Sequence, residues 1–388
     1  MILNPSLAAT DVPPVPEARR WGLEYDGRAG PLINVSQAAP VEPPHRRLRA
    51  EIARAAMEDD AAHLYGPVLG LPALREAVAA RWSAEYGGAV SPAQVAITAG
   101  CNQAFCTAIA SLAAPGDAVI LPVPWYFNHK MWLDQSGVRT IPLPCGPGLI
   151  PEAERAAALI DGATRAIVLV SPNNPTGAEY PAETLRAFMD LARARGLALV
   201  LDETYRDFDS RPAPVHGLFE DPGWDDTLIQ LYSFSKAYRL TGHRVGAMVA
   251  SEARLAQAEK ILDTVTICPP GLGQRAALWG MAHLGQWLAG ERAEILARRA
   301  AVAALGLPGW EVDGLGAYFA YMRHPWEAPS SDVARMLARE AGVLALPGTM
   351  FGPEGTGERH LRVAFANLDV AGIAALGARL AAAPALRP

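Results

Sequence analysis

The feature that most constrains the fold of this chain is an alternation of short apolar runs and helical stretches between residues 94 and 249. Continuous Val, Ile and Leu runs, without strict polar alternation, are typical of strands that are buried on both faces. The seven runs that predict strands are 94–98, 118–121, 138–143, 166–170, 197–201, 228–232 and 245–249. Because helical segments separate most of them, we expect an α/β fold whose mostly parallel central sheet is covered by helices.

The segments outside this region predict a second, smaller domain. Residues 1 to about 30 contain several prolines and few apolar repeats, so we expect an extended arm there. The residue patterns predict helices at 47–62, 72–86, 252–266, 274–305 and 332–341. They also predict strands at 318–323 and 361–366, followed by a last helix. We therefore predict three parts: an arm with part of the small domain at 1–45, a large domain at 46–285, and a small α+β domain at 286–388.

The composition argues against several classes of function. Of 388 residues, 51% are apolar and 19% are charged, as in ordinary folded proteins. The 34 basic and 40 acidic residues give a net charge of −6, whereas nucleic-acid-binding proteins usually carry a basic surface. No apolar run approaches the roughly 20 residues that span a membrane. The four cysteines have no CxxC spacing and the first residues do not resemble a signal peptide, so we expect a reduced, cytoplasmic protein.

Polar residues gather in the segments that follow the predicted strands, which is where α/β proteins bind their ligands. In ITAGCNQAF, Gly100 permits a tight turn, and the N–H groups of Cys101 and Asn102 at a helix start would form a phosphate cradle. In SPNNPTG, Pro175 keeps Asn174 out of helical conformation, so that its amide can face the cleft. An ordinary turn that binds no ligand is the alternative for each segment, although SPNNPTG after a strand is the more specific string.

A carboxylate follows the next predicted strand. In LVLDETYRDF, Asp202 ends the apolar run, and Tyr205 lies three residues further on. A carboxylate buried at a strand end requires a cationic partner, which makes Asp202 a candidate binding residue. An aspartate in this position is also able to cap a helix, so both interpretations stay open.

The loop YSFSKAYRLTGHRVG combines hydroxyls and cations. Ser233, Ser235 and Arg244 are the groups that suit a phosphate dianion. Lys236 lies among small and apolar neighbours, where the pKa of its amine is readily lowered and the amine becomes nucleophilic. The chain has only three lysines, so few residues are available for chemistry that requires an amine.

A phosphate site, a buried carboxylate and a reactive lysine are the parts that pyridoxal phosphate requires from a protein. The chain has no GxxxxGK[ST], HExxH or GxSxG motif, so the common signatures of P-loop, zinc and serine-nucleophile chemistry are absent. We expect no metal site.

These motifs resemble those of the class I/II aminotransferases, the fold-type I family of pyridoxal-phosphate enzymes. SPNNPTG, DETY and SFSKAYRLTGHRVG occur in the family's order, with 28 residues from Asn174 to Asp202 and 34 from Asp202 to Lys236. The resemblance runs from about residue 33 to the end. It implies pyridoxal 5'-phosphate as cofactor and a homodimer, in which Tyr65 of one subunit reaches the phosphate in its neighbour.

The resemblance also implies a role for each matching residue. Lys236 would form the Schiff base with the cofactor and then shuttle a proton, and Asp202 would pair with the pyridine nitrogen. Tyr205 and Asn174 would hydrogen-bond the phenolate oxygen. The remaining cofactor positions are Gly100, Cys101, Asn102, Ser233, Ser235 and Arg244 for the phosphate, Tyr126 stacked on the ring, and His129 bonded to Asp202.

Substrate binding is implied at three positions. Arg362, in LRVAFAN, matches the arginine that holds the substrate α-carboxylate, although a surface residue of a strand is the alternative. Asn174 would lie beside the substrate as well. Ala38 stands where the family often has a glycine against the substrate, so its methyl group would narrow the pocket.

We therefore expect a cytoplasmic, homodimeric aminotransferase that moves an amino group between an L-amino acid and a 2-oxo acid, without nucleic-acid or membrane partners. One alternative is a pyridoxal-phosphate C–S lyase of a sulfur amino acid, because the cofactor residues are shared. A second alternative is a non-catalytic sensor domain that binds the cofactor. The acidic net charge and the presence of both Lys236 and Arg362 disfavour the sensor.

Overall fold

All seven predicted strands form one sheet in the computed structural model, which describes residues 3–383. The strands are β2 (Val95–Thr98), β3 (Ala118–Val123), β4 (Arg139–Pro144), β5 (Thr164–Val170), β6 (Ala198–Asp202), β7 (Leu228–Ser233) and β8 (Gly246–Val249). Their order across the sheet is β2-β8-β7-β6-β5-β3-β4. Only β8 runs antiparallel to its neighbours β2 and β7, so the prediction of a mostly parallel sheet is confirmed.

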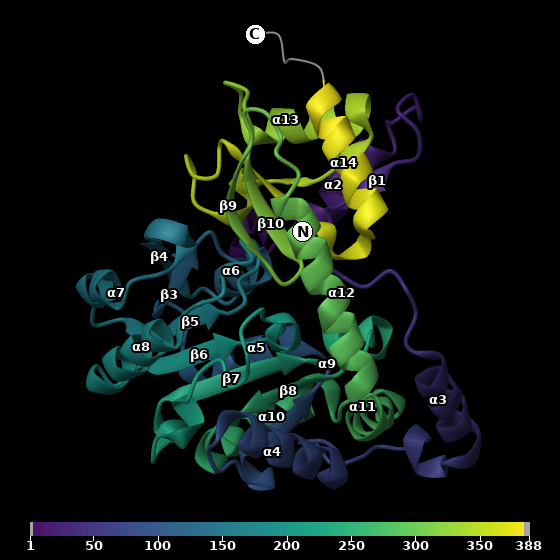
Figure 1. The fold of residues 1–388 in the computed structure, drawn as a ribbon. Coiled ribbons are helices and arrows are strands. Elements are labelled where there is room, and N and C mark those ends of the chain that lie inside the picture. Colours follow the sequence, from purple (N-terminus) through teal and green to yellow (C-terminus); the bar gives the residue numbers. More distant parts are fainter. Residues whose placement is uncertain (1–2, 384–388) are drawn as a thin grey trace.

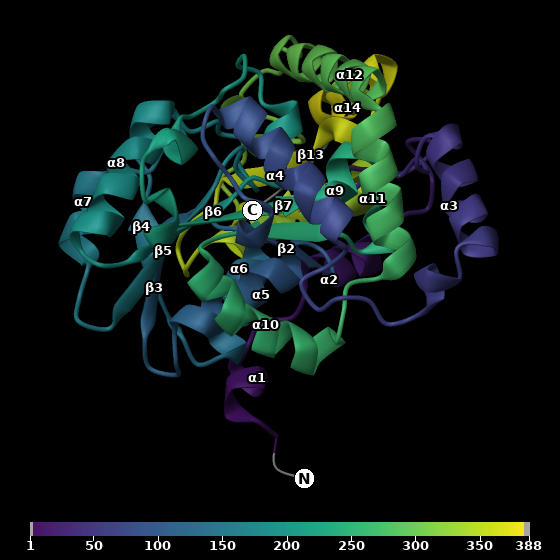
Figure 2. The same cartoon turned by 90° about the horizontal axis from the view of Figure 1, so that it is seen from below.

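Helices cover both faces of this sheet (Figures 1 and 2). One face packs against α5 (Cys101–Leu112), α6 (Phe127–Gln135) and α10 (Glu252–Thr266), and the other against α4 (Pro72–Tyr86), α8 (Ala182–Ala194) and α11 (Gly271–His283). In α8, Leu185, Phe188, Met189 and Ala192 are buried, and this spacing places them on one side of the helix. The sheet is therefore enclosed between two apolar layers.

The remaining helices of the large domain are α3 (Arg46–Glu58), α7 (Ala153–Leu159) and the single turn α9 (Phe234–Ala237). α3 packs against α11, α7 packs against α8 and β4, and α9 directly follows β7. The helix predicted at 47–62 corresponds to α3 and a following 3-10 turn, Asp60–His63. Asp59 lies between them in an extended conformation and accepts a hydrogen bond from Ala61 N, which ends one helix and starts the next.

The small domain is built on an antiparallel sheet with the order β12-β13-β10-β9. Its strands are β9 (Glu311–Gly316), β10 (Phe319–Arg323), β12 (Leu346–Pro347) and β13 (His360–Ala364), and β1 (Ile33–Asn34) pairs with β11 (Val343–Leu344) beside it. Two C-terminal helices, α13 (Ser330–Met336) and α14 (Val370–Ala382), pack on this unit. A π-helical turn, Leu337–Ala341, extends α13 to the end of the predicted helix.

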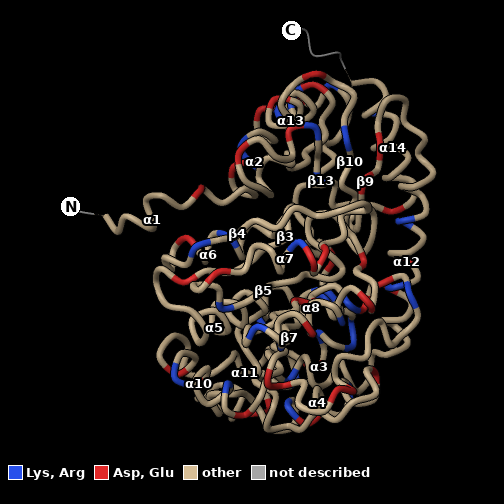
Figure 3. Tube along the Cα trace, turned by 90° about the vertical axis from the view of Figure 1, so that its left-hand side faces the viewer, with Lys and Arg blue, Asp and Glu red and all other residues tan. Residues whose placement is uncertain are grey.

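The N-terminal segment differs from the expected extended arm. It forms two helices, α1 (Pro5–Ala9) and α2 (Pro14–Gly22), each with a proline in its first turn, where the missing N–H group breaks no helical bond. Ala18 and Trp21 of α2 are buried in the core of the small domain. Only α1 lies at the edge of the molecule, beside α6 (Figure 3). The amphipathic pattern of α2 was hidden by the surrounding prolines.

The predicted helix at 274–305 is two helices, α11 and α12 (Gly285–Ala303), because the chain turns at the buried residue Leu284. α11 contacts α3 and α4, whereas α12 crosses to α14 (Figure 1). We propose a boundary between the large and small domains near residue 285, because the strands of the two sheets lie on opposite sides of it in the sequence.

No helix in residues 3–383 has both the length and the apolar character needed to cross a membrane. Acidic and basic positions are interspersed through both domains (Figure 3).

Candidate active site

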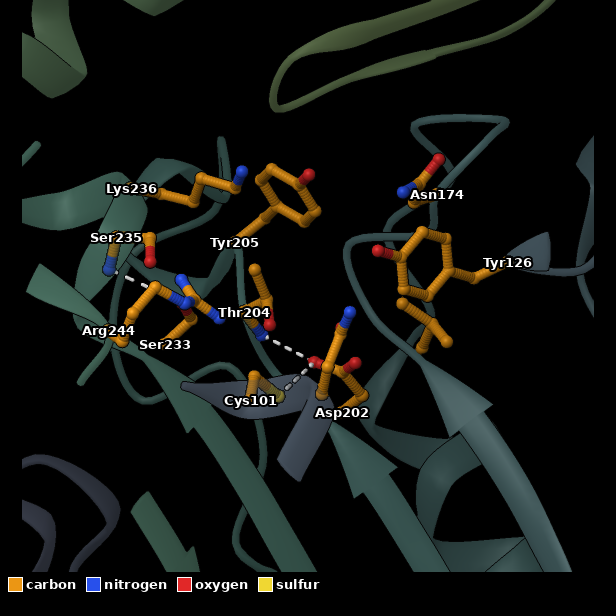
Figure 4. Close-up of a pocket in the computed structure, with 12 residues that line it drawn as sticks. Cys101, Tyr126, Asn174, Asp202, Thr204, Tyr205, Ser233, Ser235, Lys236 and Arg244 are labelled. Atoms are coloured by element: carbon orange, nitrogen blue, oxygen red, sulfur yellow. Dashed lines mark hydrogen bonds between the residues drawn. The ribbon is translucent and has the colours of Figure 1, made fainter. Parts of the chain in front are cut away.

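A cavity of about 160 Å³ lies at the carboxyl ends of β2, β5, β6 and β7. In α/β proteins this edge of the sheet is the usual place for a ligand, because loops from several strands converge there. Figure 4 shows the side chains around the cavity. Its lining residues are Cys101, Asn102, Tyr126, Val170, Asn174, Asp202, Thr204, Tyr205, Ser233, Ser235, Lys236 and Arg244.

The start of α5 forms one wall of the cavity. Gly100 precedes the helix with a φ of 89°, and a Cβ atom there would lie 2.2 Å from Arg244 Nη2. A side chain at this position would fill the space between the helix start and the guanidinium. Because the first N–H groups of a helix lack partners within the helix, Gly100 leaves a polar, electropositive corner that suits an anion.

Asp202 is the last residue of β6 and is buried. Its Oδ2 lies 3.3 Å from His129 Nε2, and its Oδ1 accepts a hydrogen bond from Thr204 N at 2.9 Å. Cys101 Sγ lies 3.6 Å from the same Oδ1. Burial alone raises the pKa of the Asp202 carboxyl, but the hydrogen bonds from His129 and Thr204 outweigh burial and hold this pKa below its ordinary value. Asp202 therefore remains ionised inside the protein.

Lys236 enters the cavity from α9, directly after β7. Its Nζ donates a hydrogen bond to Ala38 O at 2.7 Å and lies 5.6 Å from the centre of the Tyr205 ring. Burial, followed by the charges of Arg244 and Arg362, lowers the pKa of the amine to about 8. About a tenth of Lys236 is therefore uncharged at pH 7, far more than for an ordinary lysine, and the uncharged amine is the form that attacks a carbonyl group.

The hydroxyls of Ser233 and Ser235 and the guanidinium of Arg244 lie on the Lys236 side of the cavity (Figure 4). Ser233 Oγ accepts a hydrogen bond from Ser235 N at 3.3 Å, which caps the short helix α9. Arg244 has a φ of 51° and donates to Thr241 O at 3.1 Å. Two hydroxyls, a guanidinium and the corner at Gly100 form a donor set suited to a phosphate group.

Two tyrosines form the aromatic walls. Tyr126 precedes α6, and its hydroxyl accepts a hydrogen bond from Asn128 Nδ2 at 3.0 Å. Its ring meets the His129 ring edge to face at 5.0 Å, and His129 stacks on Phe105 at 3.8 Å. Tyr205 is buried, and burial raises the pKa of its phenol well above 10, so it stays a hydrogen-bond donor.

Arg362 reaches the site from β13 of the small domain and is only 2% exposed. Its Nη1 donates to Asn174 Oδ1 at 3.2 Å, and its Nη2 donates to Ser36 O. Among the described residues, its Nε has no hydrogen-bond partner. Burial lowers the pKa of the guanidinium to about 10, which leaves it charged at neutral pH. A buried cation with an unused donor is suited to a carboxylate ligand.

The structure brings most of the predicted site residues together. Ten of them line the cavity, and Gly100, His129, Ala38 and Arg362 contact residues that do. The alternative in which Arg362 is a surface residue is wrong, because its side chain is buried. Tyr65 stands apart, since it is 81% exposed and does not line this cavity.

Two lining residues were missed. Thr204 lies between Asp202 and Tyr205 in the DETY motif, and its position in that motif could have identified it. Val170 is the last residue of β5, directly before SPNNPTG, and an apolar strand end carries no polar signal that would distinguish it.

Comparisons with known proteins agree with this geometry. The family described as aminotransferase class I and II matches residues 25–380. The chain belongs to the class I and II aminotransferases. It is 30% identical to an aromatic aminotransferase of Arabidopsis thaliana over 98% of this chain and 95% of that protein. It is 33% identical to an arginine–pyruvate transaminase of Pseudomonas aeruginosa over 77% of each chain.

Solved structures show the same fold. A mutant aspartate aminotransferase of Thermus thermophilus superimposes with a TM-score of 0.89 at 25% identity, covering 99% of this chain and 100% of that one. An Escherichia coli protein described as a methionine aminotransferase superimposes with a TM-score of 0.90 at 23% identity, covering 98% and 100%. The protein is thus a fold-type I aminotransferase that uses pyridoxal phosphate. The ionised Asp202, the amine of Lys236 and the anion corner at Gly100 fit that cofactor.

Proposed function

We propose that this aminotransferase carries out its reaction at Lys236, with an L-amino acid as donor and a 2-oxo acid as acceptor. The observation that carries the proposal is that one small cavity holds a partly buried amine with a pKa of about 8 and a buried carboxylate, with Arg362 at its edge. Bound pyridoxal phosphate supplies the aldehyde that accepts the amino group and a ring that withdraws electrons from the substrate α-carbon.

Different residues of the cavity would hold different parts of the cofactor. Asp202 would face the pyridine nitrogen and keep it protonated, because an ionised carboxylate favours a neighbouring cation. Tyr126 would stack on the ring, with His129 holding Asp202 from behind. Tyr205 and Asn174 would hydrogen-bond the ring oxygen. The phosphate would be held by Gly100, Cys101, Asn102, Ser233, Ser235 and Arg244.

Lys236 would then act as the proton carrier. As a free amine, Nζ would remove a proton from the substrate α-carbon and carry that proton within the site. A pKa of about 8 lies close to neutral pH, where one group serves well as both base and acid. Arg362 would hold the α-carboxylate by a bidentate pair and so fix the α-carbon relative to Lys236.

The cofactor role of Lys236 is tested by borohydride reduction of the holoenzyme and peptide mass spectrometry. We expect the cofactor mass on the peptide that contains Lys236, and no attachment in Lys236→Ala. Attachment at Lys130 or Lys260 instead would contradict the assignment.

The reaction is tested with a panel of aromatic, basic, acidic and sulfur-containing amino donors against 2-oxoglutarate and pyruvate. We expect product only when both a donor and an oxo acid are present. Release of pyruvate and ammonia from a cysteine conjugate without an oxo acid would contradict transamination and indicate lyase chemistry.

We also infer that the enzyme is a homodimer in which Tyr65 completes the neighbouring site. Tyr65 and Leu64 are 81% and 68% exposed, and Ile267 is 41% exposed. Gly66 N donates to Cys268 Sγ at 3.4 Å, which places these two segments side by side. Clustered exposed apolar side chains commonly mark a protein interface.

The four cysteines are free thiols, which supports a reducing, cytoplasmic setting.

The shared site is tested by complementation. Tyr65→Ala and Lys236→Ala proteins are each expected to have little activity by themselves. After joint unfolding and refolding, the mixed dimer would contain one site with both an intact Lys236 and an intact Tyr65, so activity should return. Mixed dimers that form without regaining activity would contradict the role of Tyr65.

A further inference from the structure

Residues 36–42 run beside the active site, in contact with Arg362 and Lys236, and we call them the crossing segment. Two of their carbonyl groups already contact the cations of the site. Ser36 O accepts a hydrogen bond from Arg362 Nη2, and Ala38 O accepts one from Lys236 Nζ at 2.7 Å. A substrate held by its carboxylate at Arg362, with its α-carbon at Lys236, would therefore lie against Ser36, Gln37 and Ala38.

The backbone of the crossing segment receives little support from secondary structure. Val35 is held on both sides, because its N–H donates to Leu344 O at 2.9 Å and its carbonyl accepts from Ala364 N at 2.8 Å. Within residues 3–383, residues 36–42 make no backbone–backbone hydrogen bond. Their conformation thus depends on side chains from other parts of the fold.

Asn367 supplies three side-chain hydrogen bonds to this backbone, whereas Asn34, Lys236 and Arg362 supply one each. Its Nδ2 donates to Ala39 O at 2.8 Å and to Gln37 O at 3.2 Å, and its Oδ1 accepts from Val41 N at 3.3 Å. One half-buried amide side chain therefore contacts three backbone groups on both sides of Ala38. Asn367 follows β13 by three residues, so it belongs to the same short stretch of chain as Arg362.

The crossing segment has room to move away from the site. On its outer side, Pro40, Val41 and Glu42 line a second cavity of about 270 Å³, which Asn367 also lines. Without the amide contacts, residues 40–42 could shift into that space. Ala38 is partly buried and packs against the core of the large domain, so packing and hydrogen bonds together set its position.

We propose that Asn367 is a positioning residue for substrate binding, because it holds residues 37–41 as a wall of the amino-acid site between Lys236 and Arg362. This inference rests on the proposed function. It concerns the substrate site and leaves the cofactor contacts unchanged, because none of the residues assigned to the cofactor contacts Asn367 through a hydrogen bond in the described chain.

The test compares Asn367→Ala and Asn367→Asp with the wild-type holoenzyme in steady-state kinetics. Asp keeps the acceptor for Val41 N and loses both donors, so the two variants are expected to behave alike. We expect KM for the amino donor to rise about tenfold, with kcat changed less than about threefold and cofactor affinity unchanged. An unchanged KM in a folded variant, or an equal loss of cofactor affinity, would overturn the proposal.

Arg19→Ala is the matched control. Arg19 Nη2 bonds the side chain of Gln37 at 2.6 Å, so this variant removes a contact to the same segment without touching its backbone. We expect its KM to stay within about twofold of wild type. A rise equal to that of the Asn367 variants would overturn the specific role of Asn367.

Hydrogen–deuterium exchange supplies a readout that needs no activity. In Asn367→Ala, exchange of the Val41 amide, which donates to Asn367 in the wild type, should increase about tenfold, while β13 stays protected. Equal protection of the Val41 amide in both proteins would overturn the proposal. A wild-type enzyme that is inactive with every donor would contradict the proposed function instead, so the two failures are distinguishable.

Discussion

Arg362 Nη1 and Asn174 Oδ1 are joined by a hydrogen bond of 3.2 Å, which connects the small domain to the large domain at the active site. Arg362 extends from β13, and Asn174 lies in the loop that follows β5. This contact orients the guanidinium, whose only other hydrogen bond within residues 3–383 is to Ser36 O. A substrate carboxylate therefore meets a cation whose direction is already set.

Replacing Arg362 with lysine should weaken amino-acid binding. Lysine keeps the charge but loses the planar pair of donors that a carboxylate accepts, so we expect KM for donor and acceptor to rise about a hundredfold. Arg359→Lys, just before the same strand, is the control, since Arg359 pairs with the exposed Glu327. Equal KM values in the Arg362→Lys and Arg359→Lys enzymes would show that Arg362 does not bind the carboxylate.

Replacing Asp202 with asparagine should slow the cofactor chemistry while the protein still folds. A neutral amide fills the same space but cannot stabilise a protonated pyridine nitrogen, so we expect the transamination rate to fall by about two to three orders of magnitude. Asp134→Asn is the control, because Asp134 pairs with Lys130 on α6 and does not line the cofactor cavity. Stopped-flow absorbance of the half-reaction measures both. A rate within tenfold of wild type would refute the assignment of Asp202.

The pKa of Lys236 predicts how the stability of the cofactor-free protein depends on pH. The folded protein lowers this pKa to about 8 from an unfolded value of about 10.4, so the unfolded chain binds more protons between these values. The resulting penalty is complete below pH 8 and disappears as the pH rises towards 10.4.

Lys236→Met should therefore stabilise the cofactor-free protein by up to ~3 kcal/mol at pH 7, with the gain shrinking above pH 8. Urea unfolding at pH 7 and pH 10 measures the difference. Lys260→Met, on the exposed side of α10, should change stability by less than ~0.5 kcal/mol at both pH values. A gain that is independent of pH would show that burial does not penalise the charge of Lys236.

Gly177 should tolerate no side chain. Its φ is 75°, and a Cβ atom would lie 2.3 Å from Gly316 N, where the loop after SPNNP meets β9 of the small domain. We expect Gly177→Ala to lower the free energy of unfolding by about 2–4 kcal/mol through strain and overpacking. Gly162→Ala, where a Cβ meets nothing within 4 Å, should be nearly neutral in urea unfolding. Equal stability of the two variants would contradict the close approach.

The sequence predicted the strands of the large domain well because most of them are runs of apolar residues, and such a pattern is local. Asp202 and Lys236 were identifiable for a related reason, since a charged residue at the end of an apolar strand stands out by position alone. The helices were predicted less accurately than the strands. The break at Leu284 was missed because a buried leucine fits both a continuous helix and a turn. α2 was missed because its prolines resemble those of an irregular arm.

The sequence by itself thus determined the order of strands and helices, the identity of the lysine and the residues suited to the cofactor, because these depend on patterns within short segments. Only the tertiary structure decided that Ser36 and Ala38 face Arg362 and Lys236, and that Asn367 holds the segment between them. Those contacts join residues about 200 to 330 positions apart, and they arise from the packing of the two domains. A local sequence pattern does not predict how far apart two such segments lie in space. The shape of the amino-acid site is therefore a property of the folded chain.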